Sequence, residues 1–274
     1  MSGKMPKNLF VVRHGASELN HIIESGLKNK DSELFTDDNK NTPDRCWRLT
    51  DTGRKQATTI GEWIQSVETC FEGYYVSPYI RCLETAAYMN LPNAKWEEKR
   101  TLRERSYGEI CVATRDEFKK KYPRNWNFRK NDSIYWRPPS GESIADVAEN
   151  RVHNFLMSLK HDNVDDSVIV VSHGDWISAL SLVLENLSDE QFLERYSSKD
   201  SEIKNGACVQ YSRVNPFSDG KTVTDRFEWK RMVVPVLSDN GQNVEVSEWK
   251  HFEKPLFSNE QLLNFAENYE IKFD

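Results

Sequence analysis

Two histidines in this sequence each end a run of apolar residues, and a glycine follows each of them. His14 comes after the run 9–12 and Arg13, and His173 comes after the run 168–171 and one serine. Such runs are typical of strands that are buried on both faces, and in open α/β sheets ligands bind at the carboxyl ends of these strands. If the two strands are parallel neighbours in one sheet, their ends bring both imidazoles to the same edge.

The side chains at these strand ends are of the types that phosphoryl transfer requires. The reaction needs an in-line nucleophile, cations at the equatorial oxygens and a proton for the leaving oxygen. His14, at an exposed strand end, is the candidate nucleophile, because imidazole has a reference pKa of about 6.5 and is readily neutral near pH 7. Arg13 and Arg81 can hold phosphate oxygens, and protonated His173 can add a further donor. The intermediate of such a reaction is a phosphohistidine.

Arg81 follows a third strand-like run, residues 73–76. Pro78 fits the first turn of the next helix, so we expect Arg81 in the opening turns of that helix, near the same edge of the sheet. An arginine exposed on a helix surface is the alternative interpretation. The grouping of two arginines and two histidines at three strand ends favours a functional role.

Glu104 is the candidate general acid, because a carboxyl group beside a bound phosphate has its pKa raised by the like charge. A solvated charge is the alternative, since Glu104 lies in the polar run 99–105. Three other carboxylates compete for this role: Glu84, Glu109 and Glu142. We expect Glu142 instead to help start a helix that runs from Ser143 to about residue 159, where apolar residues recur at helical spacing.

Six motifs, in this order, resemble those of the histidine phosphatase superfamily, also called phosphoglycerate mutase-like. They are Arg-His-Gly at 13–15 followed by Asn20, Leu-Thr-x-x-Gly-x-x-Gln-Ala at 49–57, Ser-Pro-x-x-Arg-x-x-x-Thr-Ala at 77–86, Leu-x-Glu-x-x-x-Gly at 102–108, Gly-Glu-Ser at 141–143 and Ser-His-Gly at 172–174. The resemblance extends from residue 9 to about residue 182, and the tail beyond is not covered with the same specificity.

The resemblance implies a role for each matched residue. His14 would be the nucleophile, Glu104 the proton donor, and three further residues would complete the catalytic set: Arg13, Arg81 and His173. The implied substrate-binding residues are Arg13, Asn20, Arg81, His173 and Gly174.

The resemblance also implies an α/β fold, a three-layer α/β/α sandwich whose mostly parallel central sheet has helices on both faces. A chain of 274 residues can bury a substantial core as one domain. We expect a single domain over residues 1–274, with a core over about 8–215 and a C-terminal extension over about 216–274. In this tail we expect strands over 208–214 and 226–236, the second one antiparallel at an edge, and a helix over 258–269.

Two polar segments are inserted between the motifs. Residues 21–47 are expected to form a solvated loop, with the alternative that they lie over the active site. Residues 110–140 include the basic and aromatic stretch 119–130. In similar proteins the segment after the acid motif covers the active site, so the resemblance implies a lid that contacts an anionic substrate. An exposed, charged helix is the alternative.

Three residues differ from what the family often has at these positions. Ala16 replaces a glutamate, Ser106 replaces a histidine of the mutase version of the acid motif, and Asp175 replaces a small residue after Gly174. We expect Asp175 to lie close to the phosphate pocket and to disfavour highly charged substrates. These departures favour a phosphatase over a mutase.

We therefore expect a metal-independent phosphomonoester hydrolase that acts through a phosphohistidine on a small phosphorylated metabolite. Phosphoglycerate mutase-type phosphoryl transfer is the second hypothesis. A non-catalytic module that binds phosphate ligands is the third, and the intact catalytic set speaks against it.

Composition argues against several other classes of protein. The net charge of −6 and the isoelectric point near 5.7 argue against a nucleic-acid binder. No apolar stretch approaches the ~20 residues of a membrane span, and no signal-peptide core precedes the first strand, so we expect a cytoplasmic protein without a membrane partner. The five cysteines and the remaining histidines are scattered, which predicts free thiols, no metal site and no cofactor. The sequence leaves the oligomeric state and the physiological substrate open.

Overall fold

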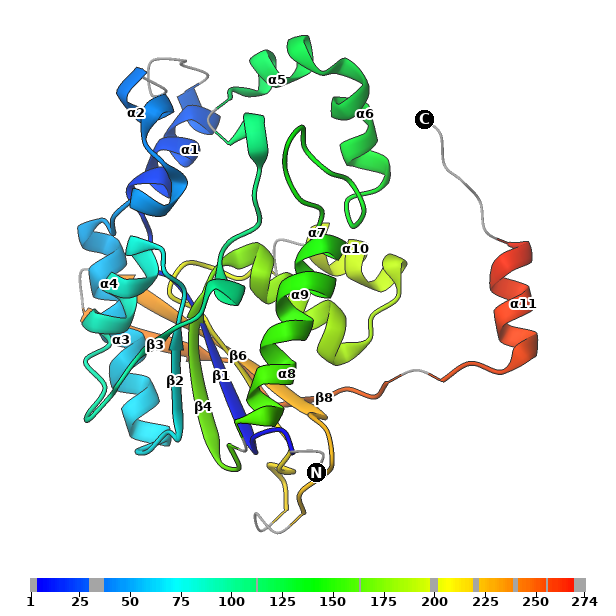
Figure 1. The fold of residues 1–274 in the computed structure, drawn as a ribbon. Coiled ribbons are helices and arrows are strands. Elements are labelled where there is room, and N and C mark those ends of the chain that lie inside the picture. Colours follow the sequence, from blue (N-terminus) through cyan, green and yellow to red (C-terminus); the bar gives the residue numbers. More distant parts are fainter. Residues whose placement is uncertain are drawn as a thin grey trace.

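The computed structural model describes residues 4–29, 37–111, 113–162, 164–197, 202–218, 222–238, 241–254 and 256–268. Their strands form one mixed sheet in the order β3-β2-β4-β1-β5-β6-β7, with β8 paired to β6. The strands are β1 (Asn8–Arg13), β2 (Gly73–Val76), β3 (Glu97–Glu98), β4 (Ser167–Ser172), β5 (Cys208–Ser212), β6 (Trp229–Ser238), β7 (Gly241–Val246) and β8 (Lys250–His251). Helices flank the sheet, so the expected α/β class is confirmed (Figure 1).

The parallel half of the sheet, β3-β2-β4-β1, carries the residues that the sequence singles out. β1 and β4 are parallel neighbours, paired from Asn8 beside Ser167 to Arg13 beside Ser172. β2 and β3 continue the parallel arrangement on the other side of β4. The carboxyl ends of β1 and β4 therefore meet at one edge, where the backbone N–H of His14 donates to the Ser172 carbonyl at 3.0 Å. The expected pairing of the two histidine-bearing strands is confirmed.

Side chains along β1 alternate between two cores, one on each face of the sheet. Leu9 and Val11 belong to one core, and Phe10 and Val12 belong to the other. The first core is covered by α7 (Ile144–Asp146), the π-helical segment η5 (Val147–Val152), α8 (His153–His161), α9 (Gly174–Glu185) and α10 (Asp189–Ser197). The second is covered by α3 (Asp51–Val67) and α4 (Ile80–Tyr88). The result is the three-layer sandwich that the resemblance implies.

Beyond β1 the sheet continues with antiparallel strands, so only the half from β3 to β1 is parallel. β5 pairs with β1, and β6 pairs with β5. The expectation that the strand near 226–236 lies at an edge is wrong, because β7 and β8 pair with the other side of β6. The sequence Asn240-Gly241 after β6 is a strong hairpin signal that predicts this return strand. The C-terminal residues therefore extend the same sheet.

Both inserted segments lie beyond the carboxyl edge of the sheet (Figure 1). The first contains α1 (Glu18–Asn29), α2 (Asp37–Asn41) and the short 3₁₀ helix η2 (Asp44–Cys46). After the 3₁₀ helix η3 (Arg100–Leu102) and the acid motif, the second contains η4 (Gly108–Ile110), α5 (Arg115–Lys121) and α6 (Pro123–Asn131). Lys40 on α2 and Glu117 on α5 form an ion pair at 3.4 Å, so the two segments touch.

The structure of the two insertions corrects part of what the sequence predicts for them. The first is largely helical where it is described, so the expected solvated loop is wrong there, and residues 30–36 lie outside the described residues. The second is more than an exposed charged helix. Phe118 on α5 is buried against Trp126 on α6, with ring centres 5.6 Å apart, and also packs on Trp136.

The C-terminal helix α11 (Asn259–Glu267) begins as the sequence predicts. Ser258 is its N-cap and accepts a hydrogen bond from the Gln261 N–H at 3.2 Å. The last predicted helical residue, Tyr269, lies outside the described residues. None of the helices found in the described ranges is both long enough and apolar enough to cross a membrane.

Candidate active site

His14 stands at the end of β1 with one ring nitrogen fixed and the other directed at a cation. Its Nδ1 lies 2.8 Å from the Gly15 carbonyl oxygen, which can only accept a hydrogen bond. Arg81 donates from Nε to the His14 Nε2 at 3.3 Å, and a guanidinium can only donate. Both partners therefore assign the proton to Nδ1 and the lone pair to Nε2, the state that a nucleophilic imidazole needs.

The surroundings of His14 favour its neutral form. Burial, and then the charges of Arg81 and Arg13, hold the pKa of His14 well below its ordinary value, although the hydrogen bond to Gly15 opposes this. The side chain is only 3% exposed, so the expectation of an exposed strand end is wrong. Arg81 on α4 and the His173 ring lie directly against the imidazole.

Arg81 lies in the first turn of α4, as expected, and it is buried rather than exposed on the helix surface. Its Nη1 donates to the carbonyl oxygen of Asp44 at 2.7 Å and to the Asp44 carboxylate at 3.1 Å. Thr85, one turn further along α4, accepts a hydrogen bond from the Gly15 N–H at 3.0 Å and donates to the Arg81 carbonyl at 2.6 Å. These bonds fix the arginine relative to the end of β1.

The sequence gives no local signal for Asp44. It lies in η2 at the end of the first insertion, 37 positions before Arg81 in the chain. The alternative that residues 21–47 lie over the active site is therefore correct for this part of the insertion.

His173 is fully buried beside His14, with ring centres 5.2 Å apart. Its Nε2 lies 2.8 Å from the Ser77 hydroxyl, and the Tyr79 ring packs against it. Burial, and then the charges of Arg81, His14 and Arg13, hold the pKa of His173 well below its ordinary value. This direction of shift opposes the expected protonation of His173. A neutral imidazole still has one N–H to donate.

Arg13 reaches the site from β1 and passes close to the start of α9. Its Nη1 donates to the carbonyl oxygen of Ile203 at 2.5 Å, whereas its buried Nε has no hydrogen-bond partner among the described residues. A Cβ on Gly174 would lie 3.3 Å from this Nε. The glycine therefore leaves room for the guanidinium beside the N-terminus of α9, where backbone N–H groups favour an anion.

Asn20 has a structural role at the start of α1. Its amide oxygen accepts hydrogen bonds from the Ser17 N–H at 3.1 Å, the Ser17 hydroxyl at 2.8 Å and the Asn205 Nδ2 at 3.1 Å. Asn205 also donates to the carbonyl oxygen of His14 at 3.1 Å. The oxygen of Asn20 is thus used within the protein, and sequence reasoning missed Asn205, which precedes the start of β5.

Glu104 is the carboxyl group whose surroundings suit an acid. It accepts a hydrogen bond from the Arg105 N–H at 2.9 Å. Burial, and then the charge of Asp175, raises the pKa of Glu104 to about 7, while Arg81 and Arg13 act in the opposite direction. The charges of Arg13 and Arg81, the two arginines near His14, therefore also act on Glu104. The alternative of a fully solvated charge is wrong.

The three competing carboxylates are each held by neighbours of their own. Their partners are Arg48 and the Leu49 N–H for Glu84, Lys121 and Tyr122 for Glu109, and Arg151 and the Ser106 N–H for Glu142. These bonds engage the three carboxylates within the protein, and the hydrogen bonds from Tyr122 and then Lys121 lower the pKa of Glu109.

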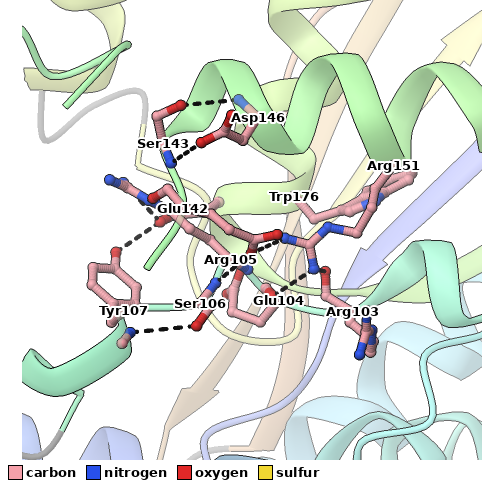
Figure 2. Close-up of polar contacts among 12 residues, drawn as sticks. Arg103, Glu104, Arg105, Ser106, Tyr107, Glu142, Ser143, Asp146, Arg151 and Trp176 are labelled. Atoms are coloured by element: carbon pink, nitrogen blue, oxygen red, sulfur yellow. Dashed lines mark hydrogen bonds and ion pairs between the residues drawn. The ribbon is translucent and has the colours of Figure 1, made fainter. Parts of the chain in front are cut away.

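Glu142 braces the acid motif instead of starting the next helix. The capping box at that helix is made by Ser143 and Asp146, so the expected role of Glu142 is wrong. Its carboxylate accepts from the Ser106 N–H at 2.8 Å and binds Arg151, which reaches from η5 to the acid-motif backbone (Figure 2). Arg151 donates to the Glu104 carbonyl at 3.0 Å. π-Helical segments such as η5 occur often at functional sites.

Asp175, in the first turn of α9, accepts hydrogen bonds on both carboxylate oxygens. Tyr107 donates to its Oδ2 at 2.7 Å, and Tyr196 on α10 donates to its Oδ1 at 3.1 Å. Arg105 forms an ion pair with it at 3.4 Å. The carboxylate is thus turned toward the acid motif.

The site has no constellation typical of a metal centre. In the part of the chain that the structure describes, no three or more His, Cys, Asp or Glu side chains are grouped as a metal ion would require. All five cysteines are free thiols, as predicted. A hollow of about 560 Å³ between the two insertions, lined by Lys40, Ile110, Glu117, Phe118, Lys121 and Tyr122 among others, includes none of the predicted site residues.

Comparison with known proteins agrees with this geometry. The model of the histidine phosphatase superfamily (branch 1) matches residues 9–201. The 2,3-bisphosphoglycerate-dependent phosphoglycerate mutase of Bartonella bacilliformis is 29% identical over 194 residues, 69% of this chain and 86% of the relative. The corresponding mutase of Brucella melitensis is 28% identical over 215 residues, 76% of this chain and 92% of the relative.

Solved structures of phosphatases share the fold. The alpha-ribazole phosphatase from Shigella flexneri has a TM-score of 0.60 and 19% identity, covering 80% of this chain and 95% of that one. A mycobacterial glucosyl-3-phosphoglycerate phosphatase has a TM-score of 0.58 and 21% identity, covering 81% and 96%. Identities this low show the fold alone. The family model spans β1 to α10 with the paired histidines in between, and this chain belongs to the histidine phosphatase superfamily.

Proposed function

We propose that this protein is a metal-independent phosphomonoester hydrolase that acts through a phosphohistidine at His14 on a small phosphorylated metabolite. The observation that carries the proposal is the state of the His14 ring. The Gly15 carbonyl holds the proton on Nδ1, and Arg81 meets the lone pair on Nε2. A buried, neutral nucleophile is thus held beside a guanidinium that can bind the phosphate it attacks.

In the proposed first step, the Nε2 lone pair attacks phosphorus and the bond from phosphorus to the leaving oxygen breaks. Arg13 and Arg81 bind the equatorial oxygens, and the N-terminus of α9 adds partial positive charge. Glu104 gives its proton to the leaving oxygen, so that an alcohol departs. In the second step a water molecule attacks the phosphohistidine, its proton passes to the Glu104 carboxylate, and inorganic phosphate leaves a neutral His14.

Phosphoglycerate mutase-type transfer is the second candidate function, because the relatives from Bartonella and Brucella are mutases. At 28–29% identity the relatives do not fix the reaction. A mutase must retain its intermediate and exclude water, whereas a hydrolase must admit water to the phosphohistidine. Ser106, where the mutase motif often has a histidine, supports the hydrolase.

Two assays on the same preparation separate the candidates. We expect release of inorganic phosphate from p-nitrophenyl phosphate and from at least one member of a panel of small phosphorylated metabolites. We expect no interconversion of 2- and 3-phosphoglycerate, with or without added 2,3-bisphosphoglycerate. Rapid interconversion with little phosphate release would favour the mutase, and no turnover of any compound would favour a binding module.

Phosphatase activity is expected to survive EDTA without loss. The positive charge that metal-dependent phosphatases take from bound ions is supplied in the proposed mechanism by Arg13, Arg81 and the start of α9. The measurement is the initial rate with p-nitrophenyl phosphate before and after prolonged incubation with chelator. Loss of activity that Mg²⁺, Mn²⁺ or Zn²⁺ restores would contradict the prediction.

A further inference from the structure

Asp175 links the acid motif to the strand end that carries His173. It stands two residues after His173, and its side chain is only 13% exposed. Arg105 and Tyr107 of the acid motif and Tyr196 on α10 all direct donor groups at its carboxylate. Three elements therefore converge on one side chain.

Three donors hold the Asp175 carboxylate beside the acid motif. Asp175 receives two phenol hydrogen bonds and one from a guanidinium. The Glu104 carboxyl accepts only a backbone hydrogen bond among its contacts with the described residues. The negative charge of a nearby carboxylate favours the protonated form of a carboxyl group. Here that carboxyl group is Glu104, whose pKa is raised by burial and then by the charge of Asp175.

Other charged groups near Glu104 and Asp175 also act on the pKa of Glu104. Arg13 from β1 and Arg81 from α4 lower the pKa of Glu104, and Asp175 raises it after burial does. The buried Arg105 guanidinium is shared, since it also donates to the carbonyl oxygens of Glu142 at 2.7 Å and Trp136 at 3.0 Å. Asp175 is the acidic neighbour that offsets the two arginines.

We propose that Asp175 is a positioning residue that keeps Glu104 protonated and fixed above the phosphate site, through its charge and its anchors on Arg105 and Tyr107. The inference rests on the proposed function, in which Glu104 is the general acid. The expectation that Asp175 disfavours highly charged substrates stays a separate prediction, because its carboxylate keeps its charge while both oxygens accept hydrogen bonds from the protein.

The test is Asp175→Asn, followed by single-turnover labelling of the enzyme across pH 5 to 9. With an alkyl phosphate such as glycerol phosphate, wild-type labelling falls as the pH rises through the pKa of Glu104. Without the negative charge of Asp175 this fall is expected about one pH unit lower, which makes labelling about tenfold slower on the alkaline side. With p-nitrophenyl phosphate, whose leaving group needs no proton, the labelling rate is expected to stay within about twofold.

Two matched variants separate the effect of the Asp175 charge from a general loss of structure. Glu190→Gln removes one negative charge from an exposed position on α10, and it is expected to leave the pH profile unchanged. Tyr196→Phe removes one hydrogen bond to Asp175 but keeps the charge, and it is expected to shift the profile less than Asp175→Asn does. Thermal unfolding of each variant reports whether the fold is retained.

The outcomes distinguish this inference from the proposed function. If wild-type enzyme is not labelled by either substrate, the proposed function fails. If it is labelled but Asp175→Asn leaves the alkaline fall in place, Asp175 does not control the proton on Glu104 and the inference is overturned. Equal slowing of both substrates without a shift would show a purely structural role and would overturn it as well.

Discussion

Replacing His14 with alanine is expected to abolish turnover, with a loss of at least about 10⁴-fold in kcat, and to prevent formation of the phosphoenzyme. The ring is the only proposed acceptor of the phosphoryl group, and neither Arg81 nor His173 is placed to substitute for it, since both are tied to other partners. The measurement is trapping of labelled phosphate, with the acid lability and alkali stability of a phosphoramidate bond as the signature.

The controls for this variant follow from the burial of His14. Because the ring is enclosed and bonded to Gly15, its removal leaves a small void, and thermal unfolding must be measured alongside activity. His21→Ala truncates an exposed histidine on α1 and should retain full activity and labelling. Labelled phosphate trapped at a residue other than His14, or full activity of His14→Ala, would overturn the assignment of the nucleophile.

The centre of the fold could be predicted from the sequence because its determinants are local. The apolar runs of β1 and β4 predict buried strands wherever they lie in the chain. Parallel pairing then brings His14 and His173 to one edge without knowledge of any other contact. Ser258 predicts the start of α11 for the same reason, since a capping box requires only residues three positions apart.

The residues that hold the catalytic side chains in place could not be predicted, because they act through contacts between distant segments. Asp44 holds Arg81, and Arg151 holds the backbone of Glu104, yet neither has a spacing that indicates it. The assignment of a capping role to Glu142 failed because Ser143 and Asp146 satisfy the helix start by themselves. For β7, in contrast, the sequence contains a local signal, the Asn-Gly pair at 240–241.

The burial of His14 is a further feature that the local sequence pattern does not predict. A strand end is exposed unless another segment covers it, and the His14 ring is in contact with Arg81 on α4 and with His173 after β4, both far from it in the chain. Burial is what lowers the pKa of His14 most strongly. The low pKa of the nucleophile therefore depends on contacts between distant segments.

Replacing Glu104 with glutamine is expected to lower turnover of alkyl phosphates by roughly 10²- to 10⁴-fold, the usual contribution of a positioned general acid. Glutamine keeps the size of the side chain and can still accept from the Arg105 N–H, so the loss reports the missing proton. An alkoxide is a poor leaving group without that proton, whereas p-nitrophenolate departs nearly unaided. Pre-steady-state labelling with both substrates isolates the phosphorylation step from the later hydrolysis.

The pH dependence of the labelling rate provides a second test of Glu104 as the general acid. In the wild type, labelling by an alkyl phosphate should fall as the pH rises through about 7, because Glu104 then loses its proton. His14 stays neutral over this range, since its pKa lies well below its ordinary value, and it adds no inflection there. Glutamine does not titrate, so the alkaline fall should be absent in Glu104→Gln.

A matched variant tests the rival acid Glu109, which is bonded to Tyr122, Lys121 and Ser140. The hydrogen bonds from Tyr122 and Lys121 lower the pKa of Glu109, so this carboxyl is ionised where the reaction needs a proton. Glu109→Gln is therefore expected to leave the ratio of labelling rates for the two substrates unchanged. Equal slowing of both substrates in Glu104→Gln would rule out its acid role in this step. A leaving-group dependence that appears in Glu109→Gln instead would transfer the role to Glu109, and the donors around that residue would then have to move when substrate binds.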